Sequence, residues 1–353
     1  MTDGSDCVIA GIDAHTDSHH VAVLDSQGRL LATSEFSATT SGYEALLDWV
    51  QTYGIIELVG VESTGAYAAG LTRALSGYGI PVVEVNQRHP HARQRRGKSD
   101  PIDAELAARA ALSGQATATP KHSSGIVEAI RQLQITRESA VKARTAALNQ
   151  LENLVVTAPE PIREQLRQRK TLQGKATVCL SFRPDLTRIH QPDQAAKLAL
   201  RSLARRIATL DNEINDLESR LDQLVAAAAP ATSSRFGVGT ITTATLLVTA
   251  GQNIDRLKSE AAFARLCAAA PIPASSGRTT RHRLDRGGDR NANRALHMIA
   301  VSRLRYCPRT RAYADRRTSE GLNKKEIIRC LKRYIARELY HTLTTDLATI
   351  PTP

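Results

Sequence analysis

The sequence predicts an α/β domain at the N-terminus, a middle region of long helices, and a mainly helical C-terminal region. Strand-like apolar runs alternate with amphipathic helical stretches at first, heptad-spaced leucines follow, and most of the positive charge comes last. A chain of 353 residues is long enough to bury more than one hydrophobic core. We therefore expect three parts, which cover residues 1–118, 119–229 and 230–353.

The first part reads as three strands followed by alternating helices and strands. The runs VIAGID and HVAVLDS predict a hairpin, and Leu30–Phe36 continues it as a third strand. Next come the helix YEALLDWVQTYG, the strand ELVGVE, the helix AYAAGLTRALSGYG, the strand PVVEVN and a helix from Asp100. Periodicity alone gives an α/β domain with a mixed sheet. The order β-β-β-α-β-α-β-α is that of an RNase H-like domain.

The middle part contains a heptad pattern over residues 195–228. Leucine recurs every seven residues from Leu203 to Leu224, and isoleucine or leucine fills the alternate core positions. This 4-3 repeat predicts a coiled-coil seam. The partner is either the helix expected over residues 126–156 of the same chain or a second subunit, and the pattern does not decide between them. Between the two helices, residues 159–192 read as a linker with short helices.

The C-terminal part begins with RFGVGTITTATLLVTAG, in which Gly237 and Gly239 flank a turn between helical segments. This turn resembles that of a helix-hairpin-helix motif, whose exposed backbone N–H groups can cradle a phosphate. A core helix, SEAAFARLCAA, and a small-residue loop, PIPASSGRTTR, follow. The helix expected after DRGG places Arg290 and Arg294 on one face. These two arginines line a phosphate track or form a solvated stripe.

The formal charge of +12 is concentrated near the C-terminus. Residues 278–338 hold 18 Lys or Arg and 6 Asp or Glu, so this segment carries the whole excess and the rest of the chain is neutral. A basic region on a balanced body is the electrostatic pattern of a nucleic-acid-binding protein. A shorter basic run, RQRRGKS, adds Arg95, Arg96 and Lys98 as candidate phosphate contacts.

The sequence favours a cytoplasmic protein associated with the nucleoid. It contains no run of 18 apolar residues, so we expect no membrane span. The N-terminus, MTDGSDCVIAG, is acidic and has no signal-peptide pattern. The five cysteines are scattered without a Cys-x-x-Cys pair. Their spacing argues against a zinc site and a disulfide framework, and fits a reducing compartment.

Four acidic residues end or begin predicted elements. Asp13 ends one apolar strand and Glu62 ends another, while Asp100 and Asp103 lie three residues apart at the start of a helix. Taken singly, Asp13 is an ordinary turn residue, and Asp100 is an ordinary N-cap. A carboxylate that ends a buried strand nevertheless needs a partner, and a divalent cation is one. Two carboxylates in a first helical turn can bind such an ion together.

The combined set resembles the Asp-Glu-Asp-Asp carboxylates of RuvC-like Holliday-junction resolvases. Along nearly its whole length, the chain resembles transposases of the insertion sequence 110 family. The matching stretches are GIDAHTDSHHVAVLD, VESTGAY, KSDPIDAELAARAA, RFGVGTITTATLLVTAG, FARLCAAAPIPASSG and LDRGGDRNANRALHMIA. This resemblance implies a RuvC-like domain in which Asp13, Glu62, Asp100 and Asp103 hold Mg²⁺ or Mn²⁺, followed by a C-terminal transposase domain.

The resemblance also implies a serine nucleophile. The serine immediately before glycine maps to Ser276, with Ser275 beside it as the alternative. The proline-rich approach PIP departs from the family, in which a basic residue is common there. An isolated Ser-Ser-Gly would be an ordinary turn, and a free serine needs a base or a metal to become a good nucleophile. The arginines that can neutralise a phosphate in the transition state are Arg278, Arg281 and Arg283.

The family resemblance implies a recombinase that acts on DNA as a dimer or tetramer and is guided by a structured RNA of its own element. Nothing in the composition itself indicates RNA. One competing function is a RuvC-like junction nuclease that uses water and the acids alone. An actin-like ATPase or sugar kinase would need a second phosphate loop, which the sequence lacks. A non-enzymatic DNA-binding protein would leave the four acids without a role.

Overall fold

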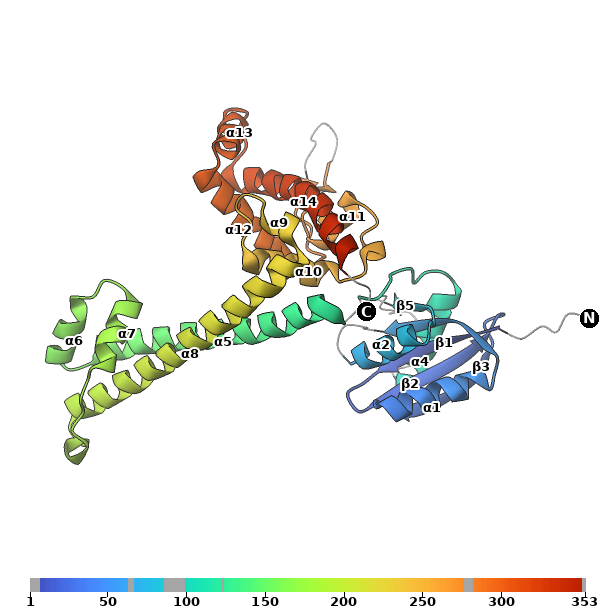
Figure 1. The fold of residues 1–353 in the computed structure, drawn as a ribbon, viewed down its shortest axis with the longest axis horizontal. Coiled ribbons are helices and arrows are strands. Elements are labelled where there is room, and N and C mark those ends of the chain that lie inside the picture. Colours follow the sequence, from blue (N-terminus) through green and yellow to red (C-terminus); the bar gives the residue numbers. More distant parts are fainter. Residues whose placement is uncertain (1–6, 63–66, 86–98, 122–123, 276–281, 351–353) are drawn as a thin grey trace, which may run out of the picture.

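The structure is a computed structural model that describes residues 7–62, 67–85, 99–121, 124–275 and 282–350. Figure 1 shows three parts in chain order: a domain built on a β-sheet, a long pair of helices, and a helical body. Within the described residues, no helix is both long enough and apolar enough to cross a lipid bilayer.

The N-terminal domain is an α/β domain, as the alternating apolar runs predict. Its elements are β1 (Cys7–Ala14), β2 (Ser18–Asp25), β3 (Leu30–Ser37), α1 (Thr40–Gln51), β4 (Ile55–Glu62), α2 (Ala69–Gly77), β5 (Val82–Val85) and α4 (Asp100–Leu112). The strands form one sheet in the order β3-β2-β1-β4-β5. Strands β1 to β3 are antiparallel, and β1, β4 and β5 are parallel. This mixed sheet is consistent with an RNase H-like domain.

Helices cover both faces of the sheet. On one face, Leu46 of α1 and Leu71 of α2 are buried against β1 and β2. On the other face, Ala108 and Ala111 of α4 pack against Ile9 of β1. Figure 1 shows the sheet between these two layers. Burial on both faces explains why the central strands read as continuous apolar runs rather than as alternating patterns.

Two glycines let α4 lie directly on the sheet. A Cβ atom at Gly11 of β1 would come within 2.1 Å of backbone atoms of α4, and one at Gly60 of β4 would come within 2.5 Å. Side chains of successive strand residues alternate between faces, so residues two apart share a face. Asp13 follows Gly11 by two residues and Glu62 follows Gly60 by two. Both acids therefore lie on the face that α4 covers.

The middle of the chain folds back on itself as an antiparallel helix pair (Figure 1). Arg137 of one long helix pairs with Glu218 of the other, and Arg144 pairs with Asp211. Of the two partners that the heptads allow, the structure thus contains the intramolecular one. The elements are α5 (Gly125–Thr157), α6 (Glu160–Arg167), α7 (Leu172–Leu180), η1 (Leu186–Arg188) and α8 (Pro192–Ala228).

The buried positions of α8 follow the predicted heptads only in part. Ile207, Ile214 and Leu221 are buried as expected, whereas the leucines that recur every seven residues are only half-buried. Leu200 and Val225 are buried in addition. The difference arises because α8 has three neighbours: it packs on α6 and α7 near its start, on α5 along its length, and on the helical body near its end. A seam to a second subunit remains a prediction.

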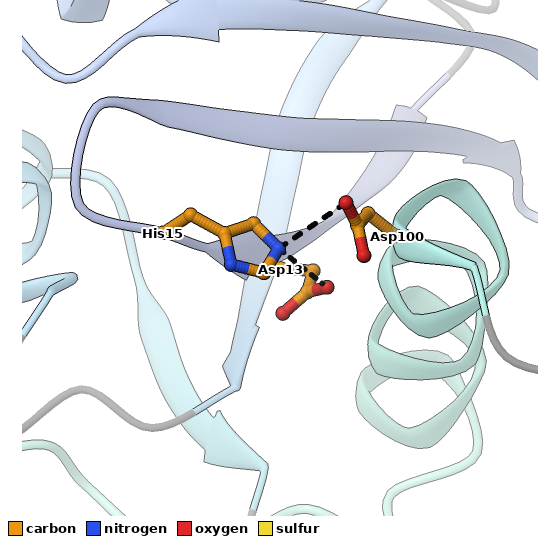
Figure 2. A group of neighbouring side chains, drawn as sticks. All are labelled: Asp13, His15 and Asp100. Carbon is orange, nitrogen blue, oxygen red and sulfur yellow. Dashed lines mark ion pairs between the residues drawn. The ribbon is translucent and has the colours of Figure 1, made fainter.

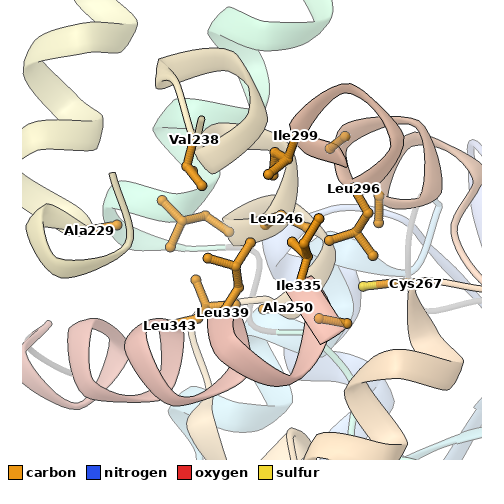
Figure 3. Packing of buried hydrophobic residues seen from close by; sticks show 14 of the residues in the cluster. Ala229, Val238, Leu246, Ala250, Cys267, Leu296, Ile299, Ile335, Leu339 and Leu343 are labelled. Carbon is orange, nitrogen blue, oxygen red and sulfur yellow. The ribbon is translucent and has the colours of Figure 1, made fainter. Parts of the chain in front are cut away.

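The helical body has its own hydrophobic core (Figure 3). Leu246, Leu296 and Leu339 come from three different helices of that core. The N-terminal part of α5 and the C-terminal part of α8 contribute to this core as well, through Ile130 and Leu221. The elements are α9 (Pro230–Ser233), α10 (Thr240–Ala250), η2 (Ile254–Arg256), α11 (Glu260–Leu266), β6 (Ile272–Pro273), β7 (His282–Arg283), α12 (Arg290–Tyr306), α13 (Pro308–Ser319) and α14 (Lys324–Thr349).

Residues 116–121 connect the sheet domain to the helical body. The carbonyl oxygen of Ala118 accepts a hydrogen bond from the amide of Glu84, 2.7 Å away, so this segment extends the edge of the sheet at β5. Three residues later, Nζ of Lys121 donates to the carbonyl oxygen of Val248 in α10 at 3.0 Å. One short segment therefore contacts both parts.

Candidate active site

A row of polar side chains crosses the sheet beneath the start of α4. Asp13 of β1 is the direct antiparallel partner of His20 in β2, and His20 is the partner of Glu35 in β3. On the other side, the ladder position after the last β1–β4 pair places Glu62 beside Asp13. Partners across a ladder point to the same face. The register therefore gives Asp13 and Glu62 neighbouring positions on one face of the sheet. Their joint role as metal ligands stays a prediction.

Helix α4 adds the other two acids to this row. Asp100 and Asp103 both lie in its first turn, where the helix dipole favours negative charge. The N-cap residue is Ser99, so the interpretation of Asp100 as the N-cap is wrong. The carboxylate of Asp100 instead lies 3.5 Å from Nε2 of His15 and 3.6 Å from Nε2 of His20. Its side chain is thus directed toward the sheet.

Asp13, His15 and Asp100 form a compact cluster (Figure 2). Nε2 of His15 lies 3.3 Å from Oδ2 of Asp13 and 3.5 Å from Oδ2 of Asp100. One ligand atom from each of the three residues lies within 4.8 Å of the others. Asp103 is only 3% exposed, and its charge acts on Asp13. Asp13 and Asp100 thus share His15, and Asp103 lies close enough for its charge to raise the pKa of Asp13. That the four acids hold one metal ion stays a prediction.

The electrostatics of the cluster favour a cation. Burial raises the pKa of Asp13, His15 lowers it, and the charges of Asp103 and Asp100 raise it again, so that the pKa lies above its ordinary value. The ionised form of Asp13 is therefore disfavoured by its surroundings. A divalent ion between these carboxylates would reverse this effect, and carboxylate oxygens are the ligands that hard cations prefer.

Sequence reasoning did not include His15, His20 and Glu35 in the site. His15 follows β1 directly, and His20 and Glu35 reach the cluster only through the strand register, in which Nε2 of His20 lies 3.6 Å from Glu35. The signal that would have found them is the run HTDSHH after Asp13. If β2 pairs with β1 as a hairpin, the second of the two adjacent histidines falls opposite Asp13.

Several predicted residues lie outside the described part of the chain. The candidate nucleophile Ser276 is one of them, and its neighbour Ser275 is the last described residue before that gap. On either side, β6 and β7 pair as a short antiparallel ladder. The other predicted residues outside the described part are Arg95, Arg96, Lys98, Arg278 and Arg281.

The remaining predicted nucleic-acid contacts lie on the helical body. Gly237 and Gly239 form the turn before α10, and Gly237 has a φ of +75°, which favours glycine. Arg283 is exposed on β7 and Arg290 begins α12. Arg294 is exposed and lies 3.4 Å from Glu138 of α5. These residues are accessible at a surface, but they belong to several elements rather than to one stripe.

Comparison with known proteins agrees with the sequence motifs. A family model described as "Transposase", of the DEDD type of IS110, matches residues 10–158. A second, described as "Transposase IS116/IS110/IS902 family", matches residues 231–315. The chain belongs to the IS110 family of transposases. The four acids of the N-terminal domain fall within the first match, and Ser276 falls within the second.

Two relatives of this IS110-family chain are proteins of insertion elements. The "uncharacterized 42 kDa protein" of insertion element IS900 from Mycobacterium paratuberculosis is 28% identical over 167 residues. The "uncharacterized 43.6 kDa protein" of IS110 from Streptomyces coelicolor is 32% identical over 136 residues. The matches cover 44% and 37% of this chain, and 42% and 33% of the relatives, so they span less than half of each protein.

Proposed function

We propose that this protein is a DNA transposase that cuts and rejoins DNA strands through a serine nucleophile, assisted by a divalent metal ion. The observation that carries the proposal is the cluster of carboxylates between the sheet and the first turn of α4, in a chain of the IS110 family. The pKa of Asp13 is raised by burial and by the charges of two neighbouring acids, and such perturbed groups cluster at functional sites.

The residues of the cluster fit Mg²⁺ or Mn²⁺. Asp13, Glu62, Asp100 and Asp103 would hold the ion through carboxylate oxygens, which are hard ligands. When bound, the ion supplies positive charge at the scissile phosphate and at the attacking and leaving oxygens. His15, which is 45% exposed, contacts both Asp13 and Asp100 and keeps their carboxylates oriented toward each other.

The proposed nucleophile is Ser276, with Ser275 as the alternative. Its Oγ attacks the phosphorus of a DNA phosphodiester, a serine–phosphate ester forms, and the bond from phosphorus to one sugar oxygen breaks. The serine loses its proton and the leaving sugar oxygen gains one, so the step is balanced and conserves a phosphoester bond. A hydroxyl of a second DNA strand can then attack the serine ester and restore the serine, which completes strand exchange.

The basic groups of the chain would bind the nucleic acids. Arginines close to the serine would neutralise the phosphate during the reaction. The turn before α10 and the arginines of α12 would hold the DNA backbone. We also propose that a structured RNA encoded by the element selects the DNA sites, and that the protein works in the cytoplasm at the nucleoid. The proposed contacts are Arg95, Arg96, Lys98, Gly237, Gly239, Arg278, Arg281, Arg283, Arg290 and Arg294.

A covalent adduct tests the proposal. The full-length protein is incubated with radiolabelled DNA that carries the element's ends, with RNA transcribed from the element and with Mg²⁺, and a denaturing gel then detects protein-bound label. We expect an adduct with the wild type and none with Ser276→Ala or Asp103→Ala. Ser275→Ala is the matched control and should retain the adduct. An adduct lost only in Ser275→Ala would move the nucleophile by one residue.

The same gel separates the proposal from a junction nuclease that uses water as the nucleophile. Such an enzyme needs the acids but no serine. Cleavage of branched DNA by Ser276→Ala, with no protein-bound label in the wild type, would show that the acids act alone. That result would overturn the serine mechanism while leaving the metal site intact.

A further inference from the structure

The helical body contains a large basic cavity that the acid cluster does not explain, and Arg283 is the one cation of its lining that the sequence motifs indicate. Its volume is about 1110 Å³. Its walls are residues 268–271 after α11, residues 282–285 around β7, and the first half of α14 with the turn that precedes it. The cationic residues of the lining are Arg283, Arg317, Arg329, Lys332, Arg333 and Arg337.

The cavity carries an excess of positive charge. The lining holds those six Lys or Arg and only two acids, Asp285 and Glu326. Both acids already accept backbone hydrogen bonds: Glu326 from the amide of Asn323 at 2.9 Å, and Asp285 from the amide of Gly287 at 2.9 Å. These contacts fix local turns, and among the described residues neither carboxylate lies within ion-pair distance of a cation of the lining.

Acids outside the lining neutralise only part of the excess. Arg333 and Arg337 share one carboxylate, that of Glu260, at 3.4 Å and 3.0 Å, and Arg317 pairs with Glu320. In the part of the chain that the structure describes, no acid lies within ion-pair distance of Arg283 or Arg329. Guanidinium groups that face a cavity without a carboxylate are available for an anionic ligand.

Lys332 makes the strongest case for a bound anion. It is only 7% exposed, and its Nζ donates to Oδ1 of Asn293 at 2.8 Å. Nδ2 of Asn293 in turn donates to the carbonyl oxygens of Cys267 and Ala268. Burial, and then the charge of Arg329, lower the pKa of Lys332. A buried ammonium group with a neutral partner costs free energy unless an anion approaches it.

We infer that this cavity binds the phosphodiester backbone of a nucleic-acid strand and leads that strand to the β6–β7 ladder, between whose strands the candidate serine lies in the sequence. The inference rests on the proposed function and adds the path of the strand. β7 forms part of the cavity wall, and β6 directly follows the wall residue Pro271. Among the described residues, Arg283, Arg329 and Lys332 of the lining have no acidic partner, and several phosphates in a row match such a group of cations better than one small anion would. The ring of Tyr334, 54% exposed at the same cavity, offers a surface on which a base can stack.

Binding without metal tests this inference. The full-length protein, in EDTA, is titrated into fluorescent single-stranded 20-mers of DNA and of RNA at several KCl concentrations, and anisotropy gives the affinity. The cavity variant is Arg329→Gln with Lys332→Gln. The control is Lys324→Gln with Lys325→Gln, which removes the same charge from the first turn of α14, outside the cavity lining. Circular dichroism checks that both variants fold.

We expect the cavity variant to bind at least tenfold more weakly, and the control to change less than threefold. The slope of log affinity against log salt should fall by about 1.4 for the two lost phosphate contacts. Loss with DNA alone, RNA alone or both identifies which strand uses the cavity. Equal effects of the cavity and control variants would overturn the inference.

Arg329→Gln alone provides a second test, since Arg329 is exposed and its loss does not threaten folding. It should weaken binding several-fold and lower the slope by about 0.7; an unchanged slope would overturn the inference. Because the assay contains no metal and detects no cleavage, it separates this inference from the proposed reaction. If no adduct forms but binding still depends on the cavity, the proposed reaction fails and this inference stands. If the adduct forms but binding does not depend on the cavity, this inference fails and the proposed reaction stands.

Discussion

Asp13 shows how one residue can cost stability and provide function. Its side chain is only 14% exposed and lies among other acids. Burial is the main reason why its pKa is raised. We predict that Asp13→Asn raises the melting temperature of the metal-free protein by a few degrees, because it removes a disfavoured charge. The same change should abolish Mn²⁺ binding measured by calorimetry. Asp17→Asn, an exposed acid of the following turn, is the control and should alter neither property.

His19 predicts a pH dependence of stability. It is fully buried on the opposite face of β2 from His20, and its ring stacks on Tyr43 at 5.7 Å. Burial lowers its pKa below the ordinary value of 6.5. The unfolded chain therefore takes up a proton near pH 6.5 while the folded chain does not, so stability is lost as the pH falls below that value.

The loss from His19 should be at most about 1.4 kcal/mol per pH unit, which corresponds to one proton. Urea unfolding between pH 7.5 and pH 5.5 measures it, with His19→Phe as the comparison because phenylalanine keeps the stacking and cannot titrate. The variant should show a flatter profile in this range. Parallel profiles would mean that His19 is protonated as easily in the folded chain as in the unfolded one.

At the scale of elements, the contact between α4 and the sheet determines whether the acids meet. A Cβ atom at Gly11 would lie 2.1 Å from backbone atoms of α4, which cannot move without displacing Asp100 and Asp103. We predict that Gly11→Ala destabilises the protein by about 3 kcal/mol and weakens metal binding. Thermal unfolding and Mn²⁺ titration measure the two effects. Gly77→Ala, where a Cβ meets nothing within 4 Å, should leave both unchanged.

The antiparallel helix pair also gives a direct prediction. Leu221 of α8 is fully buried where α5, α8 and the helical body meet. Leu221→Ala should destabilise the protein by about 2–5 kcal/mol, through lost burial and a residual cavity. Leu198→Ala, in the same helix but with the side chain 39% exposed, should cost less than about 0.5 kcal/mol. If chemical denaturation gave equal losses of unfolding free energy for the two variants, the C-terminal part of α8 would not be packed in this core.

Features that depend on a single segment of the chain could be predicted from the sequence. Strand-end acids such as Asp13 and Glu62, and the helix start at Asp100, were predictable because each follows from its own segment. The place of His20 depends on the pairing of β1 with β2, which no single segment specifies. The environment of Lys332 was harder to predict, because it is built from residues 267–293 and from α14. Periodicity describes one element at a time and does not show which elements pack together.

At the scale of the whole molecule, the two halves of the proposed chemistry lie in different parts of the chain. The acid cluster is built from β1, β2 and α4, whereas the basic cavity is lined only by residues between 268 and 337. Figure 1 shows the sheet domain and the helical body as separate parts. We propose that a site that needs both forms between subunits.

Mixing inactive variants tests this arrangement. Ser276→Ala keeps its acids and Asp103→Ala keeps its serine. If sites form between subunits of a dimer, equal mixing makes half of the dimers mixed, and each mixed dimer has one intact site. The mixture should thus recover about a quarter of wild-type adduct formation, measured on the same gel. Sites formed within one subunit would give no recovery.

The antiparallel helix pair also fixes a distance within the molecule. α8 contains 37 residues, which at about 1.5 Å per residue corresponds to about 55 Å. Pairs such as Arg137–Glu218 join it to α5 and resist bending. A turn of duplex DNA is roughly 34–36 Å long. α8 packs on α6 and α7 around Ala204 and on the helical body around Val225, so these contacts lie about 30 Å apart along the helix. Whatever is held at the α6–α7 end of the pair is therefore kept roughly one turn of duplex away from the core of the helical body.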